Sequence, residues 1–281
     1  MILGQAYMVY DGVELLEYAI KSIRNHVDYI CVLYQEVSWF GHKASKEDII
    51  ILHTLKEQGL IDDLILFDNF KPLACNKKNI IKAKRIETTK RQAGLEYCRK
   101  AGCTHYLCSD VDEFYTPSQF ELAKDIIIQE GFSLTAVKYW NYVNKPIYKI
   151  DRLFGYVPFV CRLGPRTCVS MNYPFFVSCD PTRRISVGSQ NVAKELFDPE
   201  IIVMHHMETV RKNLWKKYNA TSRSDFKRTR TQKLISRIRN VNSKSKAFTY
   251  YKVIHTMLND LPVISCDNIF DIPYEEWSIN E

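Results

Sequence analysis

Two aspartates separated by a single residue, Asp110 and Asp112, are the strongest candidates for a functional site in this chain. They directly follow the apolar run Tyr106-Leu107-Cys108. Carboxylate oxygens arranged in this way can bind a hard divalent cation, Mg²⁺ or Mn²⁺, which in turn neutralises a diphosphate. A solvated acidic turn is the alternative interpretation. Because the two aspartates lie at the end of a buried strand, we favour the metal site.

Two adjacent histidines, His205 and His206, are candidates to complete that site. They follow an apolar stretch at residues 200–204 that reads as a strand. Successive side chains of a strand point to opposite faces, so at most one ring would reach the aspartates. A neutral imidazole there could serve as a metal ligand. A histidine of the core or surface is the alternative, and the choice between the two rings stays open.

Arg91 is the cation we expect to find nearest the aspartates. It ends a basic stretch, residues 71–91, in which eight Lys and Arg stand against a single acid, Glu87. A guanidinium leading into the strand that carries the aspartates could pair with a diphosphate oxygen. Most of the lysines there are expected to form a solvated helix face.

Around these residues, strand-like and helix-like stretches alternate along the sequence. Strands are expected at residues 5–10, 28–35, 64–67 and 104–109, and helices at 13–25, 46–58 and 84–100. This alternation predicts an α/β fold with a mostly parallel sheet and flanking helices. Ligands of such sheets bind beyond the carboxyl ends of the strands, which is where Asp110 and Asp112 fall.

The pattern changes after residue 117. A helix is expected at residues 118–129, an aromatic-rich strand at 133–143 and a further strand at 200–204. Between residues 147 and 187, Gly and Pro break the sequence into short β-like pieces. We expect one domain over residues 1–210, with a basic helical extension over residues 211–281 packed on it.

That extension concentrates the positive charge. The net charge of the chain is +7, and residues 211–246 contain thirteen Lys and Arg against one acid, Asp225. Such a segment attracts polyanions. One helix there would turn Leu234, Ile238 and Val241 inward and its basic residues outward, Arg239 among them. The predicted acceptor or polyanion contacts, with aromatic rings for stacking on bases, are Trp140, Trp215, Lys216, Lys217, Arg228, Arg230 and Arg237.

Composition narrows the class of protein. Hydrophobic residues make up 46% and charged residues 25% of the chain, as in an ordinary globular protein. No apolar run is long enough for a membrane span, and the start lacks the features of a signal peptide, so we expect a cytoplasmic protein, in the host cytoplasm if the chain is viral. None of the nine cysteines forms a CxxC pair, which argues against a zinc ribbon.

Taken together, these residues resemble the GT-A glycosyltransferases, and most closely the family-two-like enzymes. The resemblance rests on the helix run Lys90-Arg91-Gln92-Ala93-Gly94-Leu95 about twenty residues before Asp110-Val111-Asp112, and on the later His-His-Met-x-x-Val-Arg that begins at His205. Within that group, a viral enzyme that modifies DNA is the member we favour.

The resemblance implies a nucleotide-diphosphate sugar as donor, with UDP as the expected nucleotide, and Mn²⁺ or Mg²⁺ as cofactor. Asp110 would contact ribose or metal, Asp112 would hold the metal, and His205 or His206 would complete its ligands. Tyr10, Asp11 and Gln35 would lie near the nucleoside. The metal and Arg91 would stabilise the leaving diphosphate.

An inverting enzyme would also need a carboxylate that takes the acceptor proton. Asp180 is our candidate, with Glu195 and Asp198 as alternatives; a retaining enzyme needs no such base. The favoured acceptor is a hydroxymethylated pyrimidine in DNA, and the alternative is a glycan or a lipid-linked acceptor. From other classes, a nucleotidyltransferase would usually show a Gly-rich phosphate loop, and a non-catalytic nucleic-acid-binding protein would leave the two aspartates unexplained.

Overall fold

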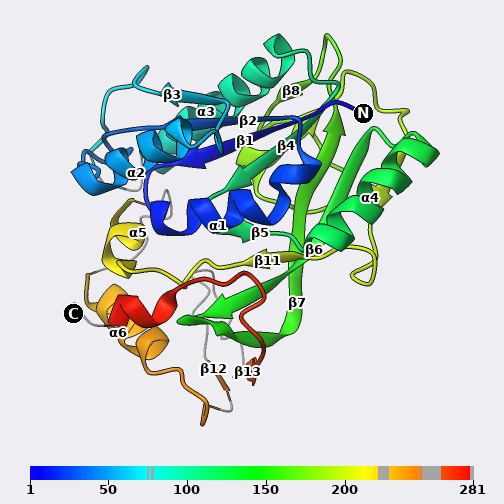
Figure 1. Cartoon of the computed structure of the whole chain (residues 1–281). Helices are drawn as coiled ribbons and strands as arrows, with labels where there is room; N and C mark the ends of the chain where they lie inside the picture. Colours follow the sequence, from blue (N-terminus) through cyan, green and yellow to red (C-terminus); the bar gives the residue numbers. More distant parts are fainter. Residues whose placement is uncertain (75, 77–78, 221–227, 246, 249–260, 279–281) are drawn as a thin grey trace.

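A mixed β-sheet forms the centre of the protein (Figure 1). The computed structural model describes residues 1–281 except 75, 77–78, 221–227, 246, 249–260 and 279–281. Four parallel strands build the first half of the sheet, in the spatial order β3 (Asp63–Leu66), β2 (Tyr29–Tyr34), β1 (Leu3–Val9) and β4 (His105–Asp110). This confirms the prediction of an α/β fold whose central sheet is mostly parallel.

The second half of the sheet adds antiparallel pairs. Strand β7 (Lys145–Arg162) lies between β4 and β6 (Leu134–Val143), antiparallel to both. Strand β11 (Met204–His206) runs parallel to β6, and β5 (Glu113–Phe114) closes this edge antiparallel to β11. The shorter strands are β10 (Lys194–Leu196) on β6, β13 (Leu261–Ser265) on β7, β12 (Ala247–Phe248) on β13, and the separate pair β8 (Cys168–Val169) and β9 (Ile185–Ser186).

Strand β7 is the main difference from the sequence-based expectation. Gly155 and Pro158 indicated breaks, yet both lie inside this 18-residue strand. The ladder between β4 and β7 ends at Val160, so at Pro158 β7 is paired with β6 alone. A proline, which lacks a backbone donor, is tolerated where a strand has an unpaired side.

Helices cover the two faces of the parallel half. Helices α1 (Val13–Ile23), α2 (Lys46–Glu57) and α4 (Pro117–Glu130) share one core with Tyr7 and Val9 of β1. The long helix α3 (Ile80–Lys100) packs on the other face, against Ala6 and Met8. Alternate residues of β1 therefore serve opposite cores, as expected for a strand buried on both sides.

The C-terminal segment joins the second half of the sheet. Helices α5 (Leu214–Ala220) and α6 (Arg228–Arg239) share a core with Tyr148 and Ile150 of β7. The predicted inward stripe is confirmed, because Leu234, Ile238 and Val241 are all buried in that core. Within the described part of the chain, short 3-10 turns lie at η1 (Arg24–His26), η3 (Pro181–Arg183) and η4 (Tyr274–Ser278). The division at residue 210 stays a prediction.

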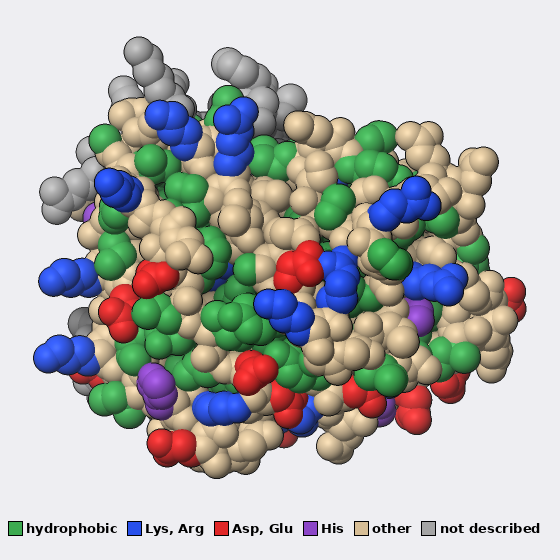
Figure 2. Space-filling view, turned by 90° about the horizontal axis from the view of Figure 1, so that it is seen from above, with side chains coloured by type: hydrophobic (Ala, Val, Ile, Leu, Met, Phe, Trp, Pro, Cys, Tyr) green, Lys and Arg blue, Asp and Glu red, His purple; other side chains and the backbone are tan. Residues whose placement is uncertain are grey.

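The surface seen from above carries charges of both signs. Lysine and arginine side chains are scattered over this face among acidic and hydrophobic ones, and do not gather in one patch (Figure 2). Within the described residues, the helices are all too short or too polar to cross a membrane.

The close packing of α3 on β1 gives a stability test at Gly94. A Cβ added there would lie 2.7 Å from the Cβ of Ala6 and 2.8 Å from the Cε of Met8. Alanine favours helix over glycine, but overpacking a core costs about 1–3 kcal/mol. We therefore expect Gly94→Ala to lower the free energy of unfolding, measured by urea titration. A variant more stable than the original would contradict this packing.

Candidate functional site

The predicted site residues gather at one edge of the sheet, where the parallel strands end. In register, Met8 lies beside Asp110 and Val9 beside Tyr34. On the other half of the sheet, His206 of β11 pairs with Asn141 of β6. Because these strands all run the same way, their carboxyl ends meet at this edge, as expected for a ligand site in an α/β sheet.

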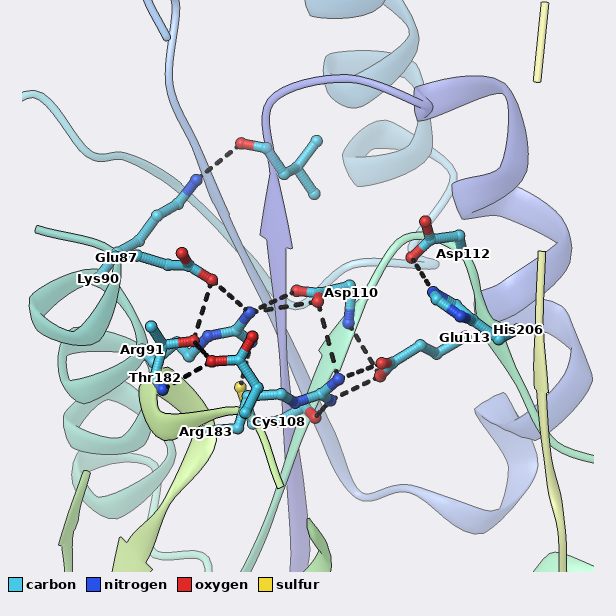
Figure 3. Close-up of polar contacts among 12 residues, drawn as sticks. Glu87, Lys90, Arg91, Cys108, Asp110, Asp112, Glu113, Thr182, Arg183 and His206 are labelled. Atoms are coloured by element: carbon cyan, nitrogen blue, oxygen red, sulfur yellow. Dashed lines mark hydrogen bonds and ion pairs between the residues drawn. The ribbon is translucent and has the colours of Figure 1, made fainter. Parts of the chain in front are cut away.

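Asp110 is held by two arginines. Nη2 of Arg91 lies 3.1 Å from one carboxylate oxygen and 3.2 Å from the other, and Nη1 of Arg183 lies 3.7 Å away (Figure 3). Burial raises the pKa of Asp110, but the two guanidinium groups outweigh it and hold the pKa below its usual value. Arg91 also contacts Glu87 and is 4% exposed. It therefore positions Asp110, and its contact with a diphosphate stays a prediction.

Asp112 is the more deeply buried of the two, with a side chain 2% exposed. Its Oδ2 accepts hydrogen bonds from Nη2 of Arg211 at 2.5 Å and from Nζ of Lys217 at 2.6 Å. Burial alone would raise the pKa of this carboxyl group, yet Lys217 and Arg211 hold it well below its usual value. Asp112 is consequently a charged carboxylate in a site largely shut off from water.

His206 faces the other oxygen of Asp112. Its Nε2 lies 3.8 Å from Oδ1, on the far side of the β4 end from Arg91 and Arg183 (Figure 3). Its Nδ1 lies 2.9 Å from the amide oxygen of Asn141. Because that oxygen only accepts, Nδ1 is the ring nitrogen that donates in this contact. Nε2 is then the ring nitrogen that faces the carboxylate of Asp112.

His205 lies elsewhere. Its Nδ1 contacts the hydroxyl of Tyr142 at 2.8 Å, and its ring packs on Phe270. Burial, with Lys149 nearby, lowers the pKa of His205 to about 4, so the ring is neutral at physiological pH. The structure thus brings only one of the two predicted histidines, His206, to Asp112.

The pair formed by Asp112 Oδ1 and His206 Nε2 fits a divalent cation. A carboxylate oxygen and an imidazole nitrogen are both established metal ligands, and the other ring nitrogen contacts Asn141, the usual second contact of a metal-binding histidine. Among the described residues, no three His, Cys, Asp or Glu side chains converge to form a complete cage. An ion here would need further oxygens from a substrate, which is how Mg²⁺ is commonly bound with phosphates.

The residues expected near a nucleoside lie at the ends of β1 and β2. The Tyr10 hydroxyl donates to the carbonyl of His42, and Asp11 Oδ2 accepts from Nη1 of Arg211 at 3.1 Å. Gln35 is 2% exposed, and its side-chain amide is engaged inside the protein. Its oxygen accepts a hydrogen bond from Lys90, and its nitrogen donates to the carbonyl of Val37. Tyr10 and Asp11 are therefore better placed to meet a ligand than Gln35.

Of the three carboxylates proposed as a base, Asp180 is the one at this edge. It precedes η3, and its Oδ1 accepts from the amide of Thr182 at 2.9 Å. The Thr182 hydroxyl also lies 3.2 Å from Glu87, the partner of Arg91. Partial desolvation raises the pKa of Asp180, but Thr182 and Arg91 lower it overall, so this exposed carboxylate is charged at neutral pH.

The two alternatives lie away from the site. Glu195 is on β10 in register with Thr135, at the start of β6, whereas Asn141 is near the end of that strand. At about 3.3 Å per residue this is roughly 20 Å along the strand. Asp198 accepts from the amide of Glu200 in a turn.

The basic segment contributes to the site itself. Lys217 contacts Asp112, and Lys216 pairs with Asp48 while its ammonium lies 5.8 Å from the ring centre of Tyr10. The predicted contact of these two lysines with an acceptor stays a prediction. Arg239, expected to point outward, donates instead to the carbonyls of Arg211 and Lys212.

The other predicted acceptor residues are spread out. Trp140 pairs in register with His205, and the ammonium of Lys149 lies 4.5 Å from its ring centre. Trp215 is half-buried on α5, and Arg237 is exposed on α6. The side chains of Arg228 and Arg230 lie outside the described residues.

Sequence reasoning missed four charged residues of the site: Lys90, Glu113, Arg183 and Arg211. Glu113 directly follows the aspartates and forms a buried ion pair with Arg183. Arg211 was visible as the arginine after the two histidines. Lys90 donates to the carbonyl of Val9 at 2.7 Å, and nothing in its lysine-rich surroundings distinguishes it from an exposed neighbour.

Comparisons with known proteins give a weak structural likeness only. No family model matches the sequence, and no curated protein matches it. Crystal structures of S. aureus TarS match half of the chain. The TM-score is 0.31 at 10% identity for TarS, covering 22% of that chain, and 0.32 at 11% identity for TarS 1-349 in complex with UDP-GlcNAc, covering 35% of it. The chain thus spans about a fifth to a third of these proteins, and the scores are too low to carry a functional argument.

Lys90 gives a pH-dependent prediction for stability. Burial and the neighbouring Arg91 lower its pKa to about 7, whereas the unfolded chain titrates near the usual 10.5. Between these values the unfolded state binds more protons, so this residue makes the protein more stable as pH rises, by up to about 1.4 kcal/mol per unit. We expect Lys90→Met to lose that increase between pH 7 and 8.5, measured by urea unfolding under reducing conditions. Equal pH dependence in both proteins would contradict the assignment.

Proposed function

We propose that this protein is a metal-dependent glycosyltransferase that uses a nucleotide-diphosphate sugar. The observation that carries the proposal is the pair formed by Asp112 Oδ1 and His206 Nε2, 3.8 Å apart at the carboxyl edge of the sheet. An incomplete set of hard and borderline donors, beside an arginine and a lysine, suits an ion that shares its ligands with a diphosphate.

The donor would lie across the ends of β1, β2 and β4. Its nucleoside would meet Tyr10 and Asp11, and its diphosphate would reach Asp112, since Arg211 links Asp11 to Asp112. UDP is the nucleotide we propose, following the likeness of the sequence motif to GT-A enzymes. A bound Mn²⁺ or Mg²⁺ would supply positive charge to the departing diphosphate.

The chain's own residues would orient the donor and accept a proton. Arg91 and Arg183 fix the carboxylate of Asp110, which is 33% exposed and free to meet ribose or a sugar hydroxyl. Asp180, charged at neutral pH, would take the proton of the acceptor hydroxyl. Its hydrogen bonds from Thr182 hold it on the same network as Arg91.

The acceptor class that we favour is a hydroxymethylated pyrimidine in DNA. Lys233 and Arg237, exposed on α6, support it as contacts for a phosphate backbone. Arg211, Lys216, Lys217 and Arg239 are engaged inside the protein, which reduces the support from charge. Nucleotide release from UDP-sugars with hydroxymethylcytosine DNA, compared with glycan acceptors, decides between the classes.

Removing the charge of Asp112 tests the proposed glycosyltransferase activity. We expect Asp112→Asn to lower the release of UDP from UDP-sugars with Mn²⁺ by about 10²-fold or more, because the site would lose the group that anchors ion and diphosphate. Glu195→Gln, the same carboxyl-to-amide change on β10 beside the start of β6, should retain activity. Equal rates in both variants, or no turnover by the unmodified protein with any nucleotide sugar, would refute the function.

A second test distinguishes the proposed roles of the two histidines. His206→Gln should weaken Mn²⁺ binding by at least about tenfold, measured by electron paramagnetic resonance of the free ion, because a ligand is lost. His205→Gln should leave Mn²⁺ affinity near its original value while lowering thermal stability, since that ring is buried between Tyr142 and Phe270. The reverse pattern would place the ion elsewhere.

A further inference from the structure

Three consecutive residues of α5 reach three different places. Lys216 pairs with Asp48 near Tyr10, Lys217 contacts Asp112, and Tyr218 is buried in the core shared by α6 and β7. Helix α5 therefore lies directly against the carboxyl edge of the sheet, with Tyr218 anchoring it and two ammonium groups turned toward the site.

The two cations on Asp112 differ in their freedom to move. Arg211 is 3% exposed and is also bound to Asp11 and to the carbonyl of Glu208. Gly12 permits this close approach, because a Cβ there would lie 1.9 Å from Nη1 of Arg211. Lys217 is 17% exposed, and its four-carbon stem allows the ammonium group to turn. Arg211 is thus a fixed partner of Asp112, and Lys217 is an exchangeable one.

The charges favour such an exchange. Asp112 offers a single negative charge, and Oδ2 already accepts from Arg211 at 2.5 Å. A diphosphate arriving at the neighbouring Oδ1 side brings more negative charge and several free acceptor oxygens. An ammonium group 2.6 Å from Oδ2 is close enough to reach them by rotation of its own side chain.

We propose that Lys217 is a donor-binding residue, which neutralises Asp112 in the empty site and transfers its ammonium contact to the diphosphate of the donor. This inference rests on the proposed function. The proposal also gives the basic segment a role in donor binding. Helix α5, which carries Lys217, shares one core with α6 of that segment.

Binding measurements without turnover test the proposal. Lys217→Met and Lys217→Arg are compared with Lys212→Met, a matched loss of charge on the same segment whose ammonium lies over Trp277 instead. Titration calorimetry gives the affinity for Mn²⁺ alone and for UDP at saturating Mn²⁺, with circular dichroism to establish that each variant folds.

We expect Lys217→Met to bind UDP at least about tenfold more weakly, the loss of one charge-assisted hydrogen bond. The same variant should bind Mn²⁺ alone as tightly as the original or more tightly, because a competing cation has left Asp112. Lys217→Arg should recover most of the UDP affinity, and Lys212→Met should keep it.

Two results would overturn the proposal. If Lys217→Met binds UDP as the original protein does, the ammonium group does not move to the diphosphate, while the glycosyltransferase function stands. If Lys217→Met loses affinity for Mn²⁺ and UDP alike, Lys217 only shapes the site. A protein that binds no nucleoside diphosphate with any metal would instead refute the proposed function, and the inference with it.

Discussion

The buried carboxylate of Asp112 is the constraint on which the rest of the site depends. A charge that is 2% exposed loses most of its hydration, and only close cations or hydrogen bonds can compensate. Arg211 and Lys217 supply the cations, from the segment that follows β11. Folding the basic segment against the sheet therefore completes the site, which explains why helix α5 and the parallel strands cannot be understood separately.

The backbone near Asp112 also helps to position the partners of its carboxylate. The amide of Met207 donates to the Asp112 carbonyl at 2.7 Å, which ties the end of β11 to the aspartates and brings His206 opposite Oδ1. Gly12, with a φ of 73°, leaves the space that Arg211 occupies between Asp11 and Asp112. The two aspartates consequently do different things: Asp110 is fixed by arginines and partly exposed, and Asp112 is buried and faces a histidine.

Much of the fold and part of the site could be predicted from the sequence. The strand and helix periodicities of residues 1–110 are strong, so the parallel sheet and the place of Asp110 and Asp112 at its carboxyl edge followed from them. Strand β7 could not be predicted, because Gly155 and Pro158 look like breaks until the one-sided pairing of that strand is known. Long-range ion pairs were likewise invisible: Lys217 and Asp112 are 105 residues apart, and a lysine-rich segment reads locally as a solvated face.

The most direct test of the account is a crystal structure of the protein with Mn²⁺ and UDP, in which anomalous scattering locates the metal. The account predicts an anomalous peak at bonding distance from both Asp112 Oδ1 and His206 Nε2, with diphosphate oxygens completing the coordination. UDP bound at this edge without a peak between those two atoms, or a peak ligated by His205 or Asp110 alone, would contradict it.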